Sequence, residues 1–93
     1  MDAEANPELR QAVALRYRKS KDAAPRVTAS GQGLIAEAII RKAQEAGVTL
    51  MEDPDLVHLL NKVPIGDAIP LTLYKAVAEV LAYVYRINKT VNP

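Results

Sequence analysis

The feature that most restricts the fold is a long amphipathic segment, which we expect to form a helix from Pro70 to about Ile87. Two adjacent apolar stripes follow it at helical spacing. The first stripe consists of Leu73, Val77, Val80, Leu81 and Val84, and the second of Tyr74, Ala78, Ala82 and Tyr85. Such a wide apolar surface needs cover from a sheet and another helix, or it remains as a patch for a partner. We expect the first arrangement, with this helix packed centrally in a small α/β domain.

The size and composition of the chain exclude several classes of protein. Ninety-three residues allow one domain, and the formal net charge of +1 argues against a strongly basic nucleic-acid-binding protein. The absence of cysteine and the single histidine exclude a disulfide scaffold, a thiolate nucleophile and a multi-histidine metal site. We expect no metal and no cofactor. No apolar run is long enough to span a membrane and no signal peptide is evident, so a cytoplasmic location without membrane insertion is expected.

The first third of the chain predicts two strands. Residues 12–17 alternate with a period of two, and the β-branched residues within 26–29 favour a second strand. Residues 18–25 have no apolar periodicity and indicate a long hairpin loop. The glycines in 30–33 are expected to end the second strand.

A strand–helix–strand unit is expected to follow. Residues 34–46 place Ala36, Ile39, Ile40 and Ala43 on one helical face, and Gly47 is suited to end the helix. Residues 48–51 predict a third strand, parallel to its neighbour through a right-handed crossover. Asp53 and Pro54 predict an N-cap and first turn of another helix that stops at Val63.

These elements predict an α/β fold, with a small mixed sheet of about three to four strands packed by about three helices. We expect a domain over residues 12–88, preceded by a partly flexible segment 1–11 and followed by a tail 89–93. His58, the glycines of Gly31-Gln32-Gly33 and the carboxylates near Asp53 are each better explained by structural roles than by catalysis.

The one marked concentration of charge surrounds the hairpin loop. It consists of Arg16, Arg18, Lys19, Lys21 and Arg26, opposed by Asp22. This cluster is a candidate docking surface for an acidic partner. A nucleic-acid contact is a weaker alternative, because Tyr17 is the one aromatic residue interleaved with the cations.

The dipeptide Asn6-Pro7 is a second candidate site. An asparagine amide that attacks its own backbone carbonyl forms a succinimide and expels the following residue. Such self-cleavage requires a tightly held turn, whereas the dipeptide by itself indicates only a turn.

Several segments together resemble the C-terminal cytoplasmic domain of the FlhB/YscU/SpaS family. They are Ala12-Val13-Ala14-Leu15-Arg16-Tyr17, Ala24-Pro25-Arg26-Val27, Gly31 to Leu34, Asp53-Pro54-Asp55-Leu56, Gly66-Asp67-Ala68-Ile69-Pro70 and the run from Leu73 to Tyr85. The resemblance extends over roughly residues 6–88, and the combination of segments is specific although each alone is not. It implies a small α/β domain at the cytosolic face of a flagellar or type III export gate. There such domains help to select export substrates, and self-cleavage at an Asn-Pro-Thr-His motif accompanies a switch of specificity.

This sequence departs from the family pattern at that motif. Asn6 and Pro7 match its first half, but Glu8 and Leu9 stand where threonine and histidine belong. We therefore expect no self-cleavage. Only five residues precede Asn6, so we also expect the family's preceding strand to be missing and the edge of the strand at 12–17 to be uncovered.

The resulting prediction is a non-enzymatic protein-interaction domain of the export apparatus. Its expected partners are export-apparatus proteins or export substrates, engaged partly by strand addition and steered by the basic loop. We expect no small-molecule substrate and no nucleic acid. The alternatives are a self-processing protein that cleaves at Asn6-Pro7 and, more weakly, a nucleic-acid-binding module that uses the basic loop.

Overall fold

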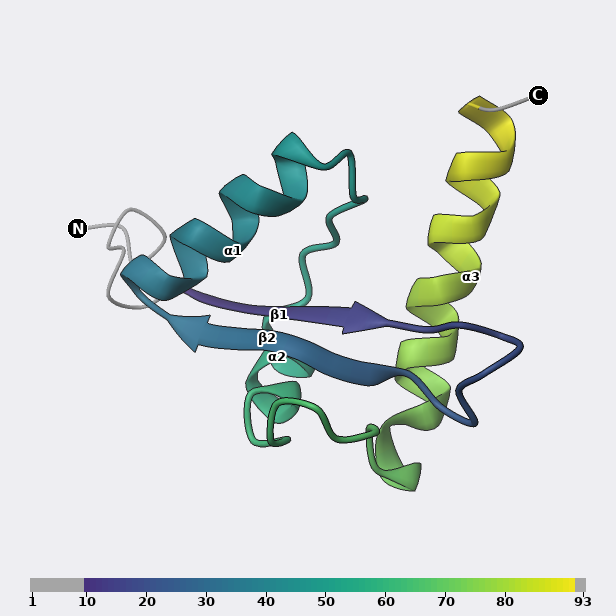
Figure 1. The fold of residues 1–93 in the computed structure, drawn as a ribbon, viewed down its shortest axis with the longest axis horizontal. Helices are drawn as coiled ribbons and strands as arrows, with labels where there is room; N and C mark the ends of the chain where they lie inside the picture. The colour runs from purple at the N-terminus through teal and green to yellow at the C-terminus, as the bar shows by residue number, and fades with distance from the viewer. Residues whose placement is uncertain (1–9, 92–93) are drawn as a thin grey trace.

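The computed structural model describes residues 10–91. The elements in chain order are β1 (Gln11–Arg16), β2 (Arg26–Gln32), α1 (Leu34–Glu45), α2 (Pro54–Leu60), the 3-10 turn η3 (Leu71–Leu73) and α3 (Tyr74–Val91). β1 and β2 form an antiparallel hairpin. Figure 1 shows α1 on one side of this hairpin, α2 on the other and α3 beside its loop end. The predicted α/β class with three helices is confirmed.

The side of the hairpin that faces α1 is lined by small residues. Ala12 lies opposite Gly31 and Ala14 opposite Ala29, so these four positions share one face of the sheet. A Cβ atom at Gly31 would collide with the side chain of Ile35, which shows how closely α1 approaches the strand. The small residues therefore set the spacing between α1 and the sheet.

The opposite face of the hairpin carries the main core. Val27 and Val77 are its largest fully buried side chains. The other buried members of this cluster are Leu56, Leu60, Val63, Ile69 and Leu73. They come from α2, from the segment between α2 and η3, and from η3, so together with Val77 of α3 the core joins β2 to α2 and to the start of the last helix.

The start of α2 forms as its sequence predicts. The Asp53 side chain accepts a hydrogen bond from the backbone N–H of Leu56, with 3.1 Å between nitrogen and oxygen, and Pro54 occupies the first turn. The helix ends at Leu60, slightly before the expected Val63. The last helix begins with η3, and α3 then continues to Val91, beyond the expected Ile87.

The third strand expected at residues 48–51 is not formed, and the parallel strand–helix–strand unit predicted from it is wrong. The sheet within residues 10–91 has two strands. The backbone N–H of Val48 instead donates to the carbonyl of Ala43, which closes the C-terminus of α1, and the Thr49 hydroxyl bonds to the side chain of Asn88. Apolar composition favours a strand, but a strand forms only where a neighbour accepts its backbone hydrogen bonds.

The second strand is longer than expected. Ser30, Gly31 and Gln32 pair with residues of β1 although their intrinsic strand propensity is low. Pairing with β1 outweighs this propensity. A register shift between Ala14 and Leu15 marks a bulge in the hairpin.

Candidate functional site

The structure brings the five predicted cations to the loop end of the hairpin. Arg16 ends β1 and lies directly opposite Arg26, which begins β2. Arg18, Lys19 and Lys21 lie on the connecting loop, and all five residues are exposed. The sequence cluster is therefore also a cluster in space.

Asp22 fixes the shape of this loop. Its side chain is only 4% exposed and accepts hydrogen bonds from the backbone N–H of Arg18 at 2.9 Å and from Arg18 Nε at 3.3 Å. A second ion pair joins its Oδ1 to Arg26 Nε at 3.7 Å. These contacts lower the pKa of Asp22: the backbone hydrogen bond from Arg18 contributes most, and the guanidinium of Arg18 adds to it.

Two of the five cations thus hold the loop in place. Arg18 and Arg26 bind Asp22, and Arg26 Nη1 also donates to the carbonyl of Gly66 at 2.9 Å. In the part of the chain that the structure describes, Arg16, Lys19 and Lys21 form no ion pair. These three side chains are the ones available to a partner.

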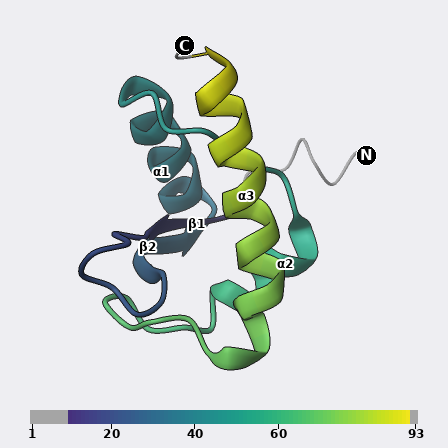
Figure 2. The same cartoon turned by 90° about the vertical axis from the view of Figure 1, so that its right-hand side faces the viewer.

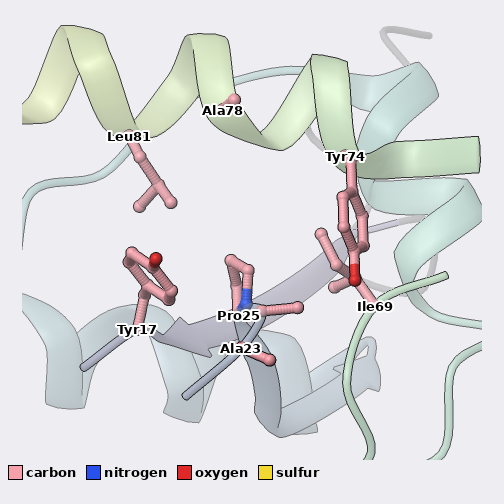
Figure 3. Close-up of a pocket in the computed structure, with 8 residues that line it drawn as sticks. Tyr17, Ala23, Pro25, Ile69, Tyr74, Ala78 and Leu81 are labelled. Carbon is pink, nitrogen blue, oxygen red and sulfur yellow. The ribbon is translucent and has the colours of Figure 1, made fainter. Parts of the chain in front are cut away.

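An apolar groove lies next to this loop. Its cavity volume is about 220 Å³. One wall comes from the loop and the other from α3, and Ile69 lies at one end beside Tyr74 (Figure 3). The lining residues are Tyr17, Ala23, Ala24, Pro25, Ile69, Tyr74, Ala78 and Leu81.

The helical wall of the groove follows from the spacing of its residues. Tyr74, Ala78 and Leu81 are separated by four and three positions, so they share one face of α3. Ala78 is small and lies between two large side chains, and it leaves the space that the groove occupies. Figure 3 shows Leu81 and Tyr74 pointing from the helix toward the loop.

The opposite wall is held by the anchored loop. Asp22 immediately precedes Ala23, Ala24 and Pro25, and the carbonyl of Pro25 accepts a hydrogen bond from the backbone N–H of Ile69 at 2.9 Å. Ala24 and Ile69 are buried, whereas Tyr17 and Tyr74 are partly exposed. The groove is therefore a preformed surface whose position depends on the Asp22 contacts.

The second apolar stripe of the last helix is exposed, and two of its members, Tyr74 and Ala78, line this groove. The sequence predicted full cover of both stripes, yet Tyr74, Ala78, Ala82 and Tyr85 are all exposed, Tyr85 by 66%. Leu73 and Val77 of the first stripe are buried in the core and Val80 and Leu81 pack against it, whereas Val84 is half-buried and the second stripe is exposed. The expectation of complete cover was wrong. The other outcome, an exposed apolar patch on the last helix, is the one that the structure shows.

Sequence reasoning identified the charged part of this site and missed the apolar part. Ala23, Ala24, Pro25 and Ile69 carry no chemical signature, and the spacing of Ala78 and Leu81 predicts only that they belong to an apolar helix surface. The one available signal was an apolar Ala-Ala-Pro run inside an otherwise charged loop.

The other sequence candidates have structural roles or lie outside the described residues. His58 is exposed on α2, and Asp53 caps that helix. Asn6 and Pro7 lie outside residues 10–91. Across those residues no group of three histidine or carboxylate side chains is placed to hold a metal ion, and no helix is both long and apolar enough to cross a membrane.

Comparison with known proteins identifies a family. The model of the FlhB, HrpN, YscU and SpaS family matches residues 5–84. The uncharacterized protein YlqH of Bacillus subtilis (strain 168) is 45% identical over 83 residues, which cover 89% of each chain. The flagellar biosynthetic protein FlhB of Yersinia enterocolitica is 44% identical over 79 residues, which cover 84% of this chain and 21% of that protein. This chain thus spans about a fifth of the length of that FlhB relative.

Solved structures show the same fold. The cytoplasmic domain of FlhB from Shewanella putrefaciens superposes with a TM-score of 0.80 at 33% identity, covering 86% of this chain and 66% of that one. The PscU C-terminal domain superposes with a TM-score of 0.76 at 29% identity, covering 80% of this chain and 95% of that one. The native SpaS C-terminal domain has a TM-score of 0.83 at 15% identity, covers 90% and 98% of the two chains, and supports the fold alone.

Proposed function

Because this chain belongs to the FlhB/HrpN/YscU/SpaS family of flagellar and type III export components, we propose that it is a non-enzymatic interaction domain of that apparatus. It acts in the cytoplasm, at the cytosolic face of the export gate, and helps to determine which proteins are exported. Its partners are export-apparatus proteins or export substrates. It takes no small-molecule substrate, does not insert into the membrane and binds no nucleic acid, in line with its net charge of +1.

The observation that carries this proposal is the apolar groove beside the basic loop. Its volume of about 220 Å³ lies below the range of about 300–1,000 Å³ that is typical of small-molecule pockets. A groove of this size fits an apolar side chain presented by a polypeptide. Arg16, Lys19 and Lys21 lie on the same loop end, so we propose that the bound segment carries carboxylates next to its apolar anchor.

Two matched variants on α3 test the groove. Ala78→Leu fills it, whereas Ala82→Leu adds the same side chain one turn later, at an exposed position that does not line the groove. Both variants are expected to fold, because leucine is a good helix former and both positions are exposed. In cells whose FlhB lacks its cytoplasmic domain, the unmodified chain and Ala82→Leu should restore export of flagellar proteins, and Ala78→Leu should not. Equal export with both variants would exclude the groove as the docking site.

The basic loop is tested separately by charge reversal. Lys19 and Lys21 form no ion pair within residues 10–91, whereas Arg18 binds Asp22. Replacing both lysines by glutamate should therefore cancel the net positive charge of the cluster without disturbing the loop. We expect weaker binding to export components at low salt and little difference at high salt, since screening removes steering between exposed charges. Binding that does not change at low salt would remove the steering role.

We also propose that this chain does not cleave itself at Asn6-Pro7. Glu8 and Leu9 stand in place of the threonine and histidine of the family motif. Intact-mass spectrometry of the purified chain after incubation at neutral pH should give one species of full mass. A fragment that begins at Pro7 would establish the self-processing alternative instead.

A further inference from the structure

The hydrogen-bond pattern of the hairpin determines which backbone groups of β1 face away from β2. The backbone N–H of Gly33 donates to the carbonyl of Arg10 at 3.0 Å, and the register then pairs Ala12 with Gly31. In an antiparallel ladder, hydrogen-bonded and non-hydrogen-bonded pairs alternate. Arg10 and Ala12 therefore direct their backbone groups toward β2, and Gln11 and Val13 direct theirs away from it.

Leu15 follows the same rule beyond the bulge. It lies opposite Val27, whose N–H donates to the carbonyl of Asp67 at 3.0 Å and whose carbonyl accepts from the N–H of Gly66 at 2.7 Å. Both backbone groups of Val27 therefore point away from β1. Leu15 and Val27 form a non-hydrogen-bonded pair, and the backbone groups of Leu15 also face outward.

Within residues 10–91, the outer edge of β1 consequently has no backbone partner. Gln11, Val13 and Leu15 present three N–H and three C=O groups there, and no backbone hydrogen bond to them exists within residues 10–91. The outer edge of β2 differs, because residues 66–67 cover it at Val27. An uncovered edge of this kind is a template for another strand.

The surroundings of this edge define what fits there. α1 contacts β1 on one face of the sheet and α2 contacts it on the other. Ile39 and Ile40 of α1 and Val57 of α2 remain only half-buried, as do Val13 and Leu15. Figure 2 shows the connection from α1 to α2 descending on the side of β1 that faces away from β2. A second folded copy would meet this connection, which favours a single extended segment as the occupant.

We propose that the outer edge of β1 accepts an extended segment of a partner polypeptide, which adds a third strand to the sheet between α1 and α2. Strands covered on both faces are near-continuous runs of β-branched apolar residues, so the bound segment has this character over about four to six residues, the length of β1. This site is distinct from the groove, which is lined from the loop and α3.

Amide hydrogen exchange of the full chain, followed by NMR, tests the proposal. The probe is the peptide acetyl-Lys-Thr-Val-Ile-Val-Thr-Lys-amide. Added peptide should slow exchange at Gln11, Val13 and Leu15 by about tenfold or more, because these N–H groups gain acceptors. Ser30 and Gln32, on the outer edge of β2, should be unaffected. The same peptide with alternate backbone nitrogens methylated retains its side chains but loses N–H donors, and it should have no effect.

Three results would overturn the proposal. The first is unchanged exchange at Gln11, Val13 and Leu15, and the second is equal slowing by the methylated peptide, which would indicate apolar contact without strand pairing. The third is protection of these amides before peptide is added. Protection that is independent of concentration would mean that residues 1–9 fill the edge, and protection that rises with concentration would mean that a second copy fills it.

Discussion

Replacing Val77 by alanine should destabilise the domain by about 2 kcal/mol. Val77 is 1% exposed and packs in the cluster that joins α3 to β2 and α2. The substitution removes two buried methyl groups, each worth about 0.8 kcal/mol of transfer free energy, and the cavity left behind adds to that cost. The higher helix propensity of alanine offsets a few tenths of a kcal/mol. At about 4–8 °C for each kcal/mol in a domain of this size, the melting temperature should fall by about 8–16 °C.

Val84 provides the matched control. It lies two turns later on the same apolar stripe, but it is only half-buried. The change in helix propensity is the same for Val84→Ala as for Val77→Ala. The difference between the two variants in the free energy of unfolding therefore reports the contribution of burying the side chain. We expect Val84→Ala to cost about 0.5 kcal/mol or less. Urea unfolding, with the midpoint and slope fitted together, measures both.

The comparison can refute the description of α3 given above. If Val84→Ala cost as much as Val77→Ala, the second half of α3 would be packed in solution. The first apolar stripe would then be covered along its whole length. If neither variant changed the urea midpoint, the cluster around Val77 would not be the core.

Three further predictions concern single residues: the ion-paired Asp22, the helix cap Asp53 and the glycine at position 33 with its positive φ. Asp22 has a pKa below its ordinary value of 3.8, so its carboxylate contributes stability above that pH and loses it as the pH falls through the folded-state pKa. Urea midpoints of Asp22→Asn should be lower than those of the unmodified chain at about pH 7 and should converge with them in acid. Asp53→Ala removes the acceptor for the Leu56 N–H and should cost about 1 kcal/mol in urea unfolding, whereas Asp53→Asn should retain most of the capping. Gly33 has φ 59°, so Gly33→Ala should lower the melting temperature by an amount that corresponds to about 1–3 kcal/mol.

The parts of the fold that the sequence predicted correctly are those set by local interactions. The Asp53 cap and the long last helix depend on residues within a few positions of one another, and the two strands of the hairpin are joined by a single loop. The prediction of a third strand was wrong because a strand requires a partner that can lie far away in the sequence. Val48 and Leu50 have the composition of a strand, but pairing depends on a neighbour that lies elsewhere in the fold, and the segment instead closes α1 and continues to α2.

The candidate site divides in the same way. The cations are close in sequence, and they could be identified from charge alone. The groove joins the hairpin loop to Ile69 and to α3, more than fifty residues away along the chain from Tyr17 to Tyr74, so its residues meet only once the tertiary structure exists. Composition also gave no sign that Arg18 and Arg26 bind Asp22. An arginine that holds the loop in place and an arginine that is available to a partner are the same residue type in the sequence.

Both proposed surfaces involve β1 or the loop that follows it, but an experiment can separate them. The loop that follows β1 forms one wall of the groove, and the outer edge of the same strand has no backbone partner among the described residues 10–91. Ala78→Leu fills the groove and leaves the backbone of β1 unchanged. The exchange response of Gln11, Val13 and Leu15 to the peptide should therefore survive in Ala78→Leu even though export is lost. If both responses disappeared together, the groove and the edge would be parts of one binding site, occupied by one continuous segment.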